Sequence, residues 1–424
     1  LNLNLKKSYP VILRPLFHRK LSITNILNVF LNLFRAKKIM ELLSFIYWGV
    51  KYNLSFYNKD DILKFLEIDP LCEFKHIKEE MNIISSGYKI TNNKYNWSYS
   101  VENFSSLWGC LFEDETKLYQ LISKDKLVEC YKFDNKITGL YIDKLNNIYT
   151  CVKGIIYKSK DDGHTFKKVL ELSTENSYFL KDAFTETPSG ELFIGEYANI
   201  WKNNDWVFVG YLYHSKDNGE NWETLDFLKH QNVNKHIHII KWSNIINGLI
   251  LSEGDNKKRI WFTKSNTNLN TTSNISEDGW KKVNKYHIQK GGHTALVELN
   301  EEIIFGSDYM GGTNFLISTN DMLRFNEKVV PNPHRRCLFR RMIVRINKKG
   351  ESEIWANLNF EYGGGVKCLI MVSIDSGKTW RKVIQYNGKQ FKVRIISYSN
   401  HITKELYILF VNNKDNTSTT LKIS

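Results

Sequence analysis

Short apolar runs alternate with turn-forming residues from about residue 83 to the end of the chain. Positions 368–372 form one such run and 381–384 belong to the next, while 373–380 between them hold polar residues, a glycine and an aromatic. Runs of this length that end at Gly, Asn, Asp or Ser are typical of β-strands joined by tight turns. The pattern predicts an all-β domain over residues 81–424.

Residues 1–80 show a different pattern. Between positions 21 and 50 the apolar residues recur at helical spacing, which predicts two amphipathic helices. The apolar positions are Ile26, Leu27, Phe30, Leu31, Phe34, Ile39, Leu42, Leu43, Ile46 and Tyr47. We therefore expect an N-terminal amphipathic helical extension over residues 1–80.

Charged residues divide this extension into short apolar stretches. Arg35, Lys37, Lys38 and Glu41 interrupt it well before the roughly 20 apolar residues that a membrane span needs. Two roles stay open for the helices. They pack on the side of the β domain or against a partner protein, or they make a peripheral membrane contact through Arg35, Lys37 and Lys38.

One eight-residue turn recurs in the β domain. Its sequence is Ser-Ile-Asp-Ser-Gly-Lys-Thr-Trp at 373–380, and similar motifs begin at Ser159 and Ser215. The aspartate of such a turn can accept hydrogen bonds from the turn's own backbone, and the glycine can adopt a positive φ. Weaker copies begin at Ser123, Ser265 and Ser318, which gives steps of about 36 to 56 residues. This spacing is that of one four-stranded propeller blade.

The motif Ser-x-Asp-x-Gly-x-Thr-Trp resembles the Asp-box, or BNR repeat, of sialidases and related β-propellers. The resemblance implies a β-propeller in which each box is a structural hairpin far from the catalytic centre. Six boxes predict six blades, with seven as the alternative, and the last strands together with residues near 83–112 would close the ring. Enzymes and non-enzymes of that family share the box, so it predicts the fold and not the activity.

Composition narrows the choice of partners. The 424 residues are 42% hydrophobic and 13% aromatic, which is too apolar for general disorder. Lysine supplies most of the net charge of +14, in an Asn/Lys/Ile-rich composition that extends over the whole chain. This charge suits a solvated surface, an acidic glycan or an anionic membrane. No basic-aromatic module for nucleic acid is present in the sequence, so no nucleic-acid partner is expected.

The cysteines and the N-terminus bear on the compartment. The six cysteines are scattered without a C-x-x-C pair, and several fall inside apolar runs as small core residues do. The apolar stretch after Lys6 and Lys7 is broken by prolines and arginines, so no signal peptide is predicted. We expect a cytoplasmic or membrane-associated protein.

Propeller geometry predicts where a site would lie. The starts of first strands and the ends of second strands share one rim, whereas the repeated turns lie on the other. Histidine, arginine, acidic and tyrosine side chains fall at the shared positions. The candidate catalytic residues are His238, Glu253, Asp255, Asp308 and Tyr362. The candidate substrate-binding residues are His236, His293, Tyr309, Arg340 and Arg341.

The His236-Ile237-His238 segment puts two imidazoles on one face of a strand. Such a pair suits a divalent metal, to which Gln289 and His293, about one blade later, would add ligands. The set loosely resembles the His/Gln metal site of some propeller polysaccharide lyases. A hydrogen-bonded pair lining the channel and a general acid or base are the alternatives.

Arginine placement argues against a true sialidase. Sialidases hold the substrate carboxylate with three arginines from separate blades, the first ahead of the first box. No arginine occurs between Arg35 and Arg259, so the early member is missing unless Arg14 or Arg19 serves, although a later cluster around Arg340 could supply the other two.

Two functions remain. The first is a carbohydrate-active propeller, a glycoside hydrolase or polysaccharide lyase acting on an acidic or cell-surface glycan. In it Glu253 or Asp255 would pair with Asp308, since glycoside hydrolysis uses two carboxyl groups about 5 to 9.5 Å apart; turn-capping acids are the alternative. The second is a non-catalytic glycan- or protein-binding module, because the fold alone does not decide.

Overall fold

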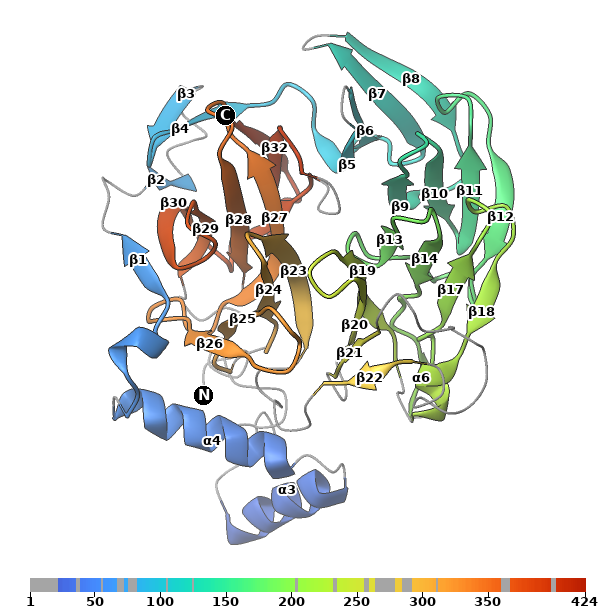
Figure 1. Cartoon of the computed structure of the whole chain (residues 1–424). Coiled ribbons are helices and arrows are strands. Elements are labelled where there is room, and N and C mark those ends of the chain that lie inside the picture. Colours follow the sequence, from blue (N-terminus) through green and yellow to red (C-terminus); the bar gives the residue numbers. More distant parts are fainter. Residues whose placement is uncertain are drawn as a thin grey trace.

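The chain forms a β-propeller of seven blades (Figure 1). The computed structural model describes residues 22–35, 39–54, 56–66, 72–74, 82–103, 106–123, 126–202, 205–231, 235–254, 259–263, 279–283, 292–309, 312–359, 367–397 and 402–424. The four strands of every blade pair antiparallel, and the first strands of neighbouring blades contact each other between blades 1 and 2 and from blade 3 through to blade 7. The prediction of an all-β propeller is confirmed.

The blades are numbered here in chain order, each from its first to its fourth strand. Blade 1 is β5 (Trp97–Asn103), β6 (Ser106–Leu111), β7 (Lys117–Ser123) and β8 (Lys126–Lys132); blade 2 is β9 (Ile137–Ile142), β10 (Ile148–Val152), β11 (Ile155–Ser159) and β12 (Lys167–Glu171); blade 3 is β13 (Phe184–Glu186), β14 (Leu192–Gly195), β17 (Leu212–Ser215) and β18 (Glu223–Leu225); blade 4 is β19 (Ile237–Ser243), β20 (Gly248–Glu253), β21 (Ile260–Phe262) and β22 (Lys281–Lys282). Blade 5 is β23 (His293–Leu299), β24 (Glu302–Ser307), β25 (Phe315–Thr319) and β26 (Asn326–Val329); blade 6 is β27 (Leu338–Ile346), β28 (Ser352–Asn359), β29 (Lys367–Ser373) and β30 (Thr379–Asn387); blade 7 is β31 (Phe391–Ile395), β32 (Leu406–Asn412), β33 (Ser418–Ile423) and β4 (Tyr88–Asn92).

The ring is closed by strands from both ends of the domain. β4 pairs antiparallel with β33, with Ile90 opposite Ile423 and Asn92 opposite Leu421, and β3 (Asn82–Ser85) adds to its outer edge. The outer strand of blade 7 therefore comes from near residue 90, within the segment that the sequence predicted to close the ring.

Of the two blade counts that the sequence allows, seven is correct. Each repeated turn falls between the third and fourth strands of a blade, and the copy at Ser265 lies there in sequence but outside the described residues. Blade 7 has no such turn, because its fourth strand does not follow its third in the chain. Six copies thus mark six blades and leave the closing one unmarked.

The repeated turns have the geometry that their residues predict. In the copy at Ser373, the serine hydroxyl accepts a hydrogen bond from the Gly377 N–H at 2.8 Å, and Gly377 has a φ of 81°. The Asp375 carboxylate accepts from the N–H and hydroxyl of Thr379, and the Trp380 indole donates to the Gly377 carbonyl. The copies at Ser159 and Ser215 make the same serine-to-glycine and aspartate contacts.

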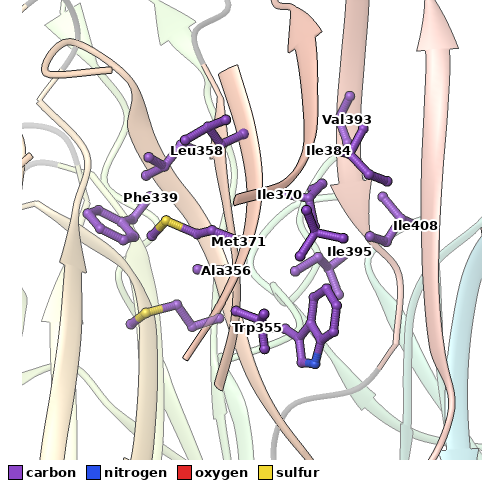
Figure 2. Close-up of a cluster of buried hydrophobic side chains, with 14 of the residues drawn as sticks. Phe339, Trp355, Ala356, Leu358, Ile370, Met371, Ile384, Val393, Ile395 and Ile408 are labelled. Atoms are coloured by element: carbon purple, nitrogen blue, oxygen red, sulfur yellow. The ribbon is translucent and has the colours of Figure 1, made fainter. Parts of the chain in front are cut away.

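The core lies between the blades rather than at one centre. Both faces of a blade are covered by its neighbours, so the inner strands are buried at most positions instead of every second one. All five residues of β10 are buried. Figure 2 shows one such layer, where Trp355 and Ile370 of blade 6 lie near Val393 and Ile408 of blade 7.

The N-terminal part holds α3 (Ile23–Arg35), α4 (Ile39–Asn53) and the short η2 (Lys59–Asp61). β1 (Lys64–Leu66) and β2 (Cys72–Glu73) then pair in parallel with β30, so this part of the chain extends blade 6. α4 rests on blade 5, where the Trp48 ring meets Phe315 edge-on at 4.9 Å. None of the helices in the described residues is long and apolar enough to cross a bilayer. The division at residue 80 stays a prediction.

Smaller elements decorate blade 3. A hairpin of β15 (Trp201–Lys202) and β16 (Asp205–Trp206) follows its second strand, and α6 (Phe227–His230) follows its fourth.

Candidate functional site

A β-bulge recurs at the start of the first strand in five of the seven blades. The strand register skips one residue there, at Ser98, Thr138, His238, Thr294 and Arg340 in blades 1, 2, 4, 5 and 6. A bulged residue is left out of the strand pairing, and bulges are frequent beside functional sites because they re-aim a side chain. Two predicted site residues, His238 and Arg340, thus occupy equivalent positions in different blades.

His236 and His238 face each other in a buried pair. Their Nε2 atoms are 3.2 Å apart, and His236 Nδ1 lies 2.6 Å from the Ala198 carbonyl oxygen. Since a carbonyl only accepts, Nδ1 of His236 carries a proton; in the neutral ring Nε2 then accepts from the Nε2–H of His238. The Tyr197 ring packs on His236 with centroids 4.0 Å apart. The arrangement holds one proton between two imidazoles.

No group of three or more His, Cys, Asp or Glu side chains in the described part of the chain is placed to hold a metal ion. His293 lies at the start of β23, where it pairs with Ser307, and Gln289 falls outside the described residues. The nitrogen of His236 that would bind a metal faces His238 at hydrogen-bond distance. We therefore derive no chemistry through a metal, and the metal site stays a prediction.

The predicted catalytic acid Glu253 is held by a hydrogen bond within its own blade. Glu253 is fully buried, and its Oε1 accepts a hydrogen bond from the Trp261 indole at 2.6 Å. Glu196, which also follows a second strand, is fully buried too and accepts from the Tyr213 hydroxyl at 2.7 Å. Glu253 therefore has the same blade-internal contact as Glu196, a contact from the carboxylate to an aromatic donor on the third strand.

The remaining predicted residues lie as follows. Asp308 is buried, and its N–H donates to the Gly292 carbonyl oxygen. Tyr309 is buried, and its N–H donates to Asn314 Oδ1 at 2.7 Å. Asp255 and Tyr362 lie outside the described residues.

Basic side chains from blades 3, 4 and 6 line the channel around one acid. Arg341 is buried, with Nη2 4.0 Å from Asp182 Oδ1. Lys181 Nζ donates to the carbonyls of Ser100 and Ile396. Burial lowers the pKa of Lys181 well below its usual value, and the Arg341 charge adds to this shift. Burial likewise lowers the pKa of Lys241, although Asp182 opposes the shift.

Arginines and tyrosines meet beside this channel. The rings of Tyr178 and Tyr197 are 5.1 Å apart, and both tyrosines are half-buried. Burial raises the pKa of Tyr178, while the charges of Arg394 and Arg340 act in the opposite direction. We call Tyr178, Tyr197, Arg340 and Arg394 the channel mouth. It combines an exposed arginine, Arg394, and a half-buried one, Arg340, with aromatic faces.

The sequence analysis missed Tyr178 and Lys241 as candidates. Tyr178 lies in the segment before β13 and reaches the mouth through its bridge to Tyr197, a contact between residues far from any motif. Lys241 had a signal: it is the one charged residue in the otherwise apolar or neutral run 237–243. A lysine there marks a position that faces the channel.

Comparisons with known proteins support the fold alone. No family model and no curated protein matches the chain. A chain of a mitotic checkpoint complex aligns with a TM-score of 0.51 at 9% identity, over 85% of this chain and 97% of its own. A luciferin-regenerating enzyme aligns with a TM-score of 0.44 at 12% identity, over 80% and 95%. The WD40 domain of Neurospora crassa Pan2 aligns with a TM-score of 0.48 at 12% identity, over 81% and 97%.

These structural neighbours are described as an enzyme in one case and as a WD40 domain in another. At such identities the likeness concerns the fold and shows no activity. The narrower resemblance to Asp-box sialidases is not among what these comparisons show.

Proposed function

We propose that this protein is a binding propeller that takes an acidic oligosaccharide at the channel mouth. What carries the proposal is the ring pair of Tyr178 and Tyr197, together with the charges of Arg340 from blade 6 and Arg394 from blade 7, which act on Tyr178. Planar guanidinium groups match the geometry of carboxylates and sulfates, and tyrosine rings offer apolar faces to a sugar ring.

The channel behind the mouth adds to the attraction for an anion. Arg341 lies with Nη2 4.0 Å from Asp182 Oδ1, and the charge of Asp182 raises the pKa of both Lys181 and Lys241 against the effect of their burial. Burial and the neighbouring Arg341 lower the pKa of Lys181, and a negative group at the mouth would act in the opposite direction. An acidic ligand therefore gains more from this site than a neutral one of the same size.

Binding is favoured over hydrolysis because the carboxylate of Glu253 is fully buried and engaged by Trp261. Cleavage of the same glycan is the second candidate. It is favoured by the His236–His238 pair beside Tyr197, since imidazoles that share a proton are suited to general acid–base work.

The test compares ligands and variants by calorimetry. The parent protein should bind acidic oligosaccharides, weakly or not at all their neutral counterparts, and less tightly at high salt. Arg340→Ala combined with Arg394→Ala should weaken binding by at least about tenfold, which is about 1.4 kcal/mol. Arg324→Ala, an exposed arginine that pairs with Asp321 in a repeated turn, is the matched control.

Equal binding of acidic and neutral sugars, or unchanged binding in the double variant, would contradict the proposal. Turnover assays on the same panel separate the two candidates. Cleavage that is lost in His238→Gln while binding persists supports the enzyme, and binding without turnover in the parent protein supports the binding propeller.

A further inference from the structure

The outer face of α3 is apolar and exposed along its whole length. Ile23, Ile26, Leu27, Phe30, Leu31 and Phe34 are 36 to 79% exposed. Their spacing of three and four residues puts them on one side of the helix. Among the described side chains of α3, Val29 and Leu33 are the buried ones. A water-soluble surface helix has the reverse arrangement.

α4 continues this exposed apolar face. Leu43, Ile46, Tyr47, Val50, Leu54 and Phe56 in α4 and the segment after it are 49 to 67% exposed. Scattered exposed apolar residues are ordinary in soluble proteins, but a contiguous patch marks a surface that binds something. The twelve side chains listed for the two segments form the apolar helical face.

α4 is attached to the propeller by its other side, so the apolar helical face stays exposed. Trp48 packs on Phe315, and the Tyr52 hydroxyl accepts a hydrogen bond from the Asn332 N–H at 2.8 Å. The Arg335 guanidinium lies 4.3 Å from the Tyr52 ring centroid. α3 packs against α4 and lies farther out than any blade (Figure 1). The apolar helical face therefore points away from the body of the molecule.

The net charge of the N-terminal segment indicates which partner the apolar helical face binds. Residues 1–54 contain nine Lys and Arg and a single Glu, an excess of eight, whereas the whole chain has an excess of fourteen. More than half of the net charge is thus carried by about an eighth of the chain. An apolar helix face within a strongly basic segment is the combination that binds the interface of an anionic bilayer.

We propose that α3 and α4 dock this protein on an anionic membrane surface, with the apolar helical face in the boundary between headgroups and acyl chains. At 13 residues α3 is about 20 Å long, too short to span the roughly 30 Å hydrocarbon core, so it lies in the plane of the interface. A second copy of this chain fits less well, because it would bring two segments of the same strong positive charge together. The proposal is independent of the function of the channel mouth.

Vesicle flotation of the full-length protein tests this proposal. It should float with phosphatidylcholine vesicles that contain about 30% phosphatidylserine, less so at high salt, and far less with phosphatidylcholine alone. Phe30→Glu combined with Phe34→Glu should lower the bound fraction at least tenfold. Both side chains are exposed, so the variant should keep the parent's unfolding temperature.

The matched control is Leu323→Glu, a 75% exposed leucine in a repeated turn, which should float like the parent protein. Absence of flotation with phosphatidylserine, or equal flotation of the double variant, overturns the proposal. Concentration-dependent self-association in sedimentation that the double variant abolishes, without vesicle binding, would instead make the face an interface between copies.

Discussion

The close packing of His236 against His238 depends on Gly254. A Cβ placed on Gly254 would lie 2.1 Å from His236 Cδ2 and 2.7 Å from His238 Nε2, distances that no carbon atom tolerates. Both imidazoles are buried, so they have little room to move aside. Gly254 therefore holds the space in which the two Nε2 atoms meet.

Gly254→Ala should destabilise the fold by about 1–3 kcal/mol, because the added methyl group overpacks a buried site. It should also separate the two imidazoles and change their NMR titration. Gly49→Ala is the control, since a Cβ on Gly49 in α4 meets nothing within 4 Å and alanine favours a helix by up to about 1 kcal/mol. A Gly254→Ala protein with parent stability in urea and unchanged imidazole signals would refute the packing argument.

The elements that repeat around the ring are hairpins stabilised by a carboxylate. In the copy at Ser215, the backbone N–H and then the side-chain amide of Asn221 hydrogen-bond Asp217 and lower its pKa to about 2. In the copy at Ser159, the Thr165 hydroxyl and N–H lower the pKa of Asp161 to about 2 as well. These turns hold the charged form of each aspartate, so they contribute stability only while it is ionised.

Acid should therefore weaken the hairpins in a defined range. The folded pKa near 2 lies below the usual value of 3.8, so this stabilisation is complete above about pH 4 and is lost as the pH falls towards 2. Asp217→Asn should lower the unfolding temperature at pH 7 and make its fall between pH 4 and 2 shallower.

Asn221→Ala should shift the same loss to higher pH, because it removes the amide donor but keeps the carboxylate. Calorimetry at pH 2, 3, 4 and 7 measures both effects. Parallel pH curves for the parent and Asp217→Asn would show that this carboxylate contributes no pH-dependent stability.

Features that depend on adjacent residues could be predicted from the sequence, and features that depend on contacts between distant residues could not. The repeated turn is specified by eight adjacent residues, so its geometry and the propeller architecture could be predicted. The channel mouth could be predicted only in part: Arg340 stands at a strand start, but Tyr178 reaches Tyr197 through a loop contact. The hydrogen bond from Trp261 to Glu253 joins residues on two neighbouring strands, eight positions apart in the chain. No pattern in the sequence indicates that this carboxylate is buried.

At the scale of the whole molecule, a buried polar network joins the closing blade to its neighbour. Glu353 of blade 6 accepts hydrogen bonds from the Tyr88 hydroxyl on β4 at 2.8 Å and from the Trp355 indole at 2.8 Å. Arg345 makes a salt bridge with Glu353 at 3.0 Å and donates to the Ile423 carbonyl of β33 at 2.6 Å. The network thus contacts both strands that close the ring.

Glu353→Ala should cost about 3–5 kcal/mol, because it leaves the buried guanidinium of Arg345 without its carboxylate. Tyr88→Phe removes a single hydrogen bond and should cost about 1 kcal/mol. Chemical unfolding of the two single variants and the double variant gives the coupling energy. Additive losses would mean that Tyr88 and Glu353 do not act together in closing the ring.

The pairing of β4 with β33 also determines when the ring can close during synthesis of the chain. More than 300 residues separate the two strands in the chain, so at about 5–20 residues per second the ribosome needs roughly 15 to 65 s after making β4 before its partner exists. Throughout that interval the nascent ring is an open arc with an unpaired strand edge, the kind of edge on which chains aggregate. That edge can be paired only once the final blade has been made.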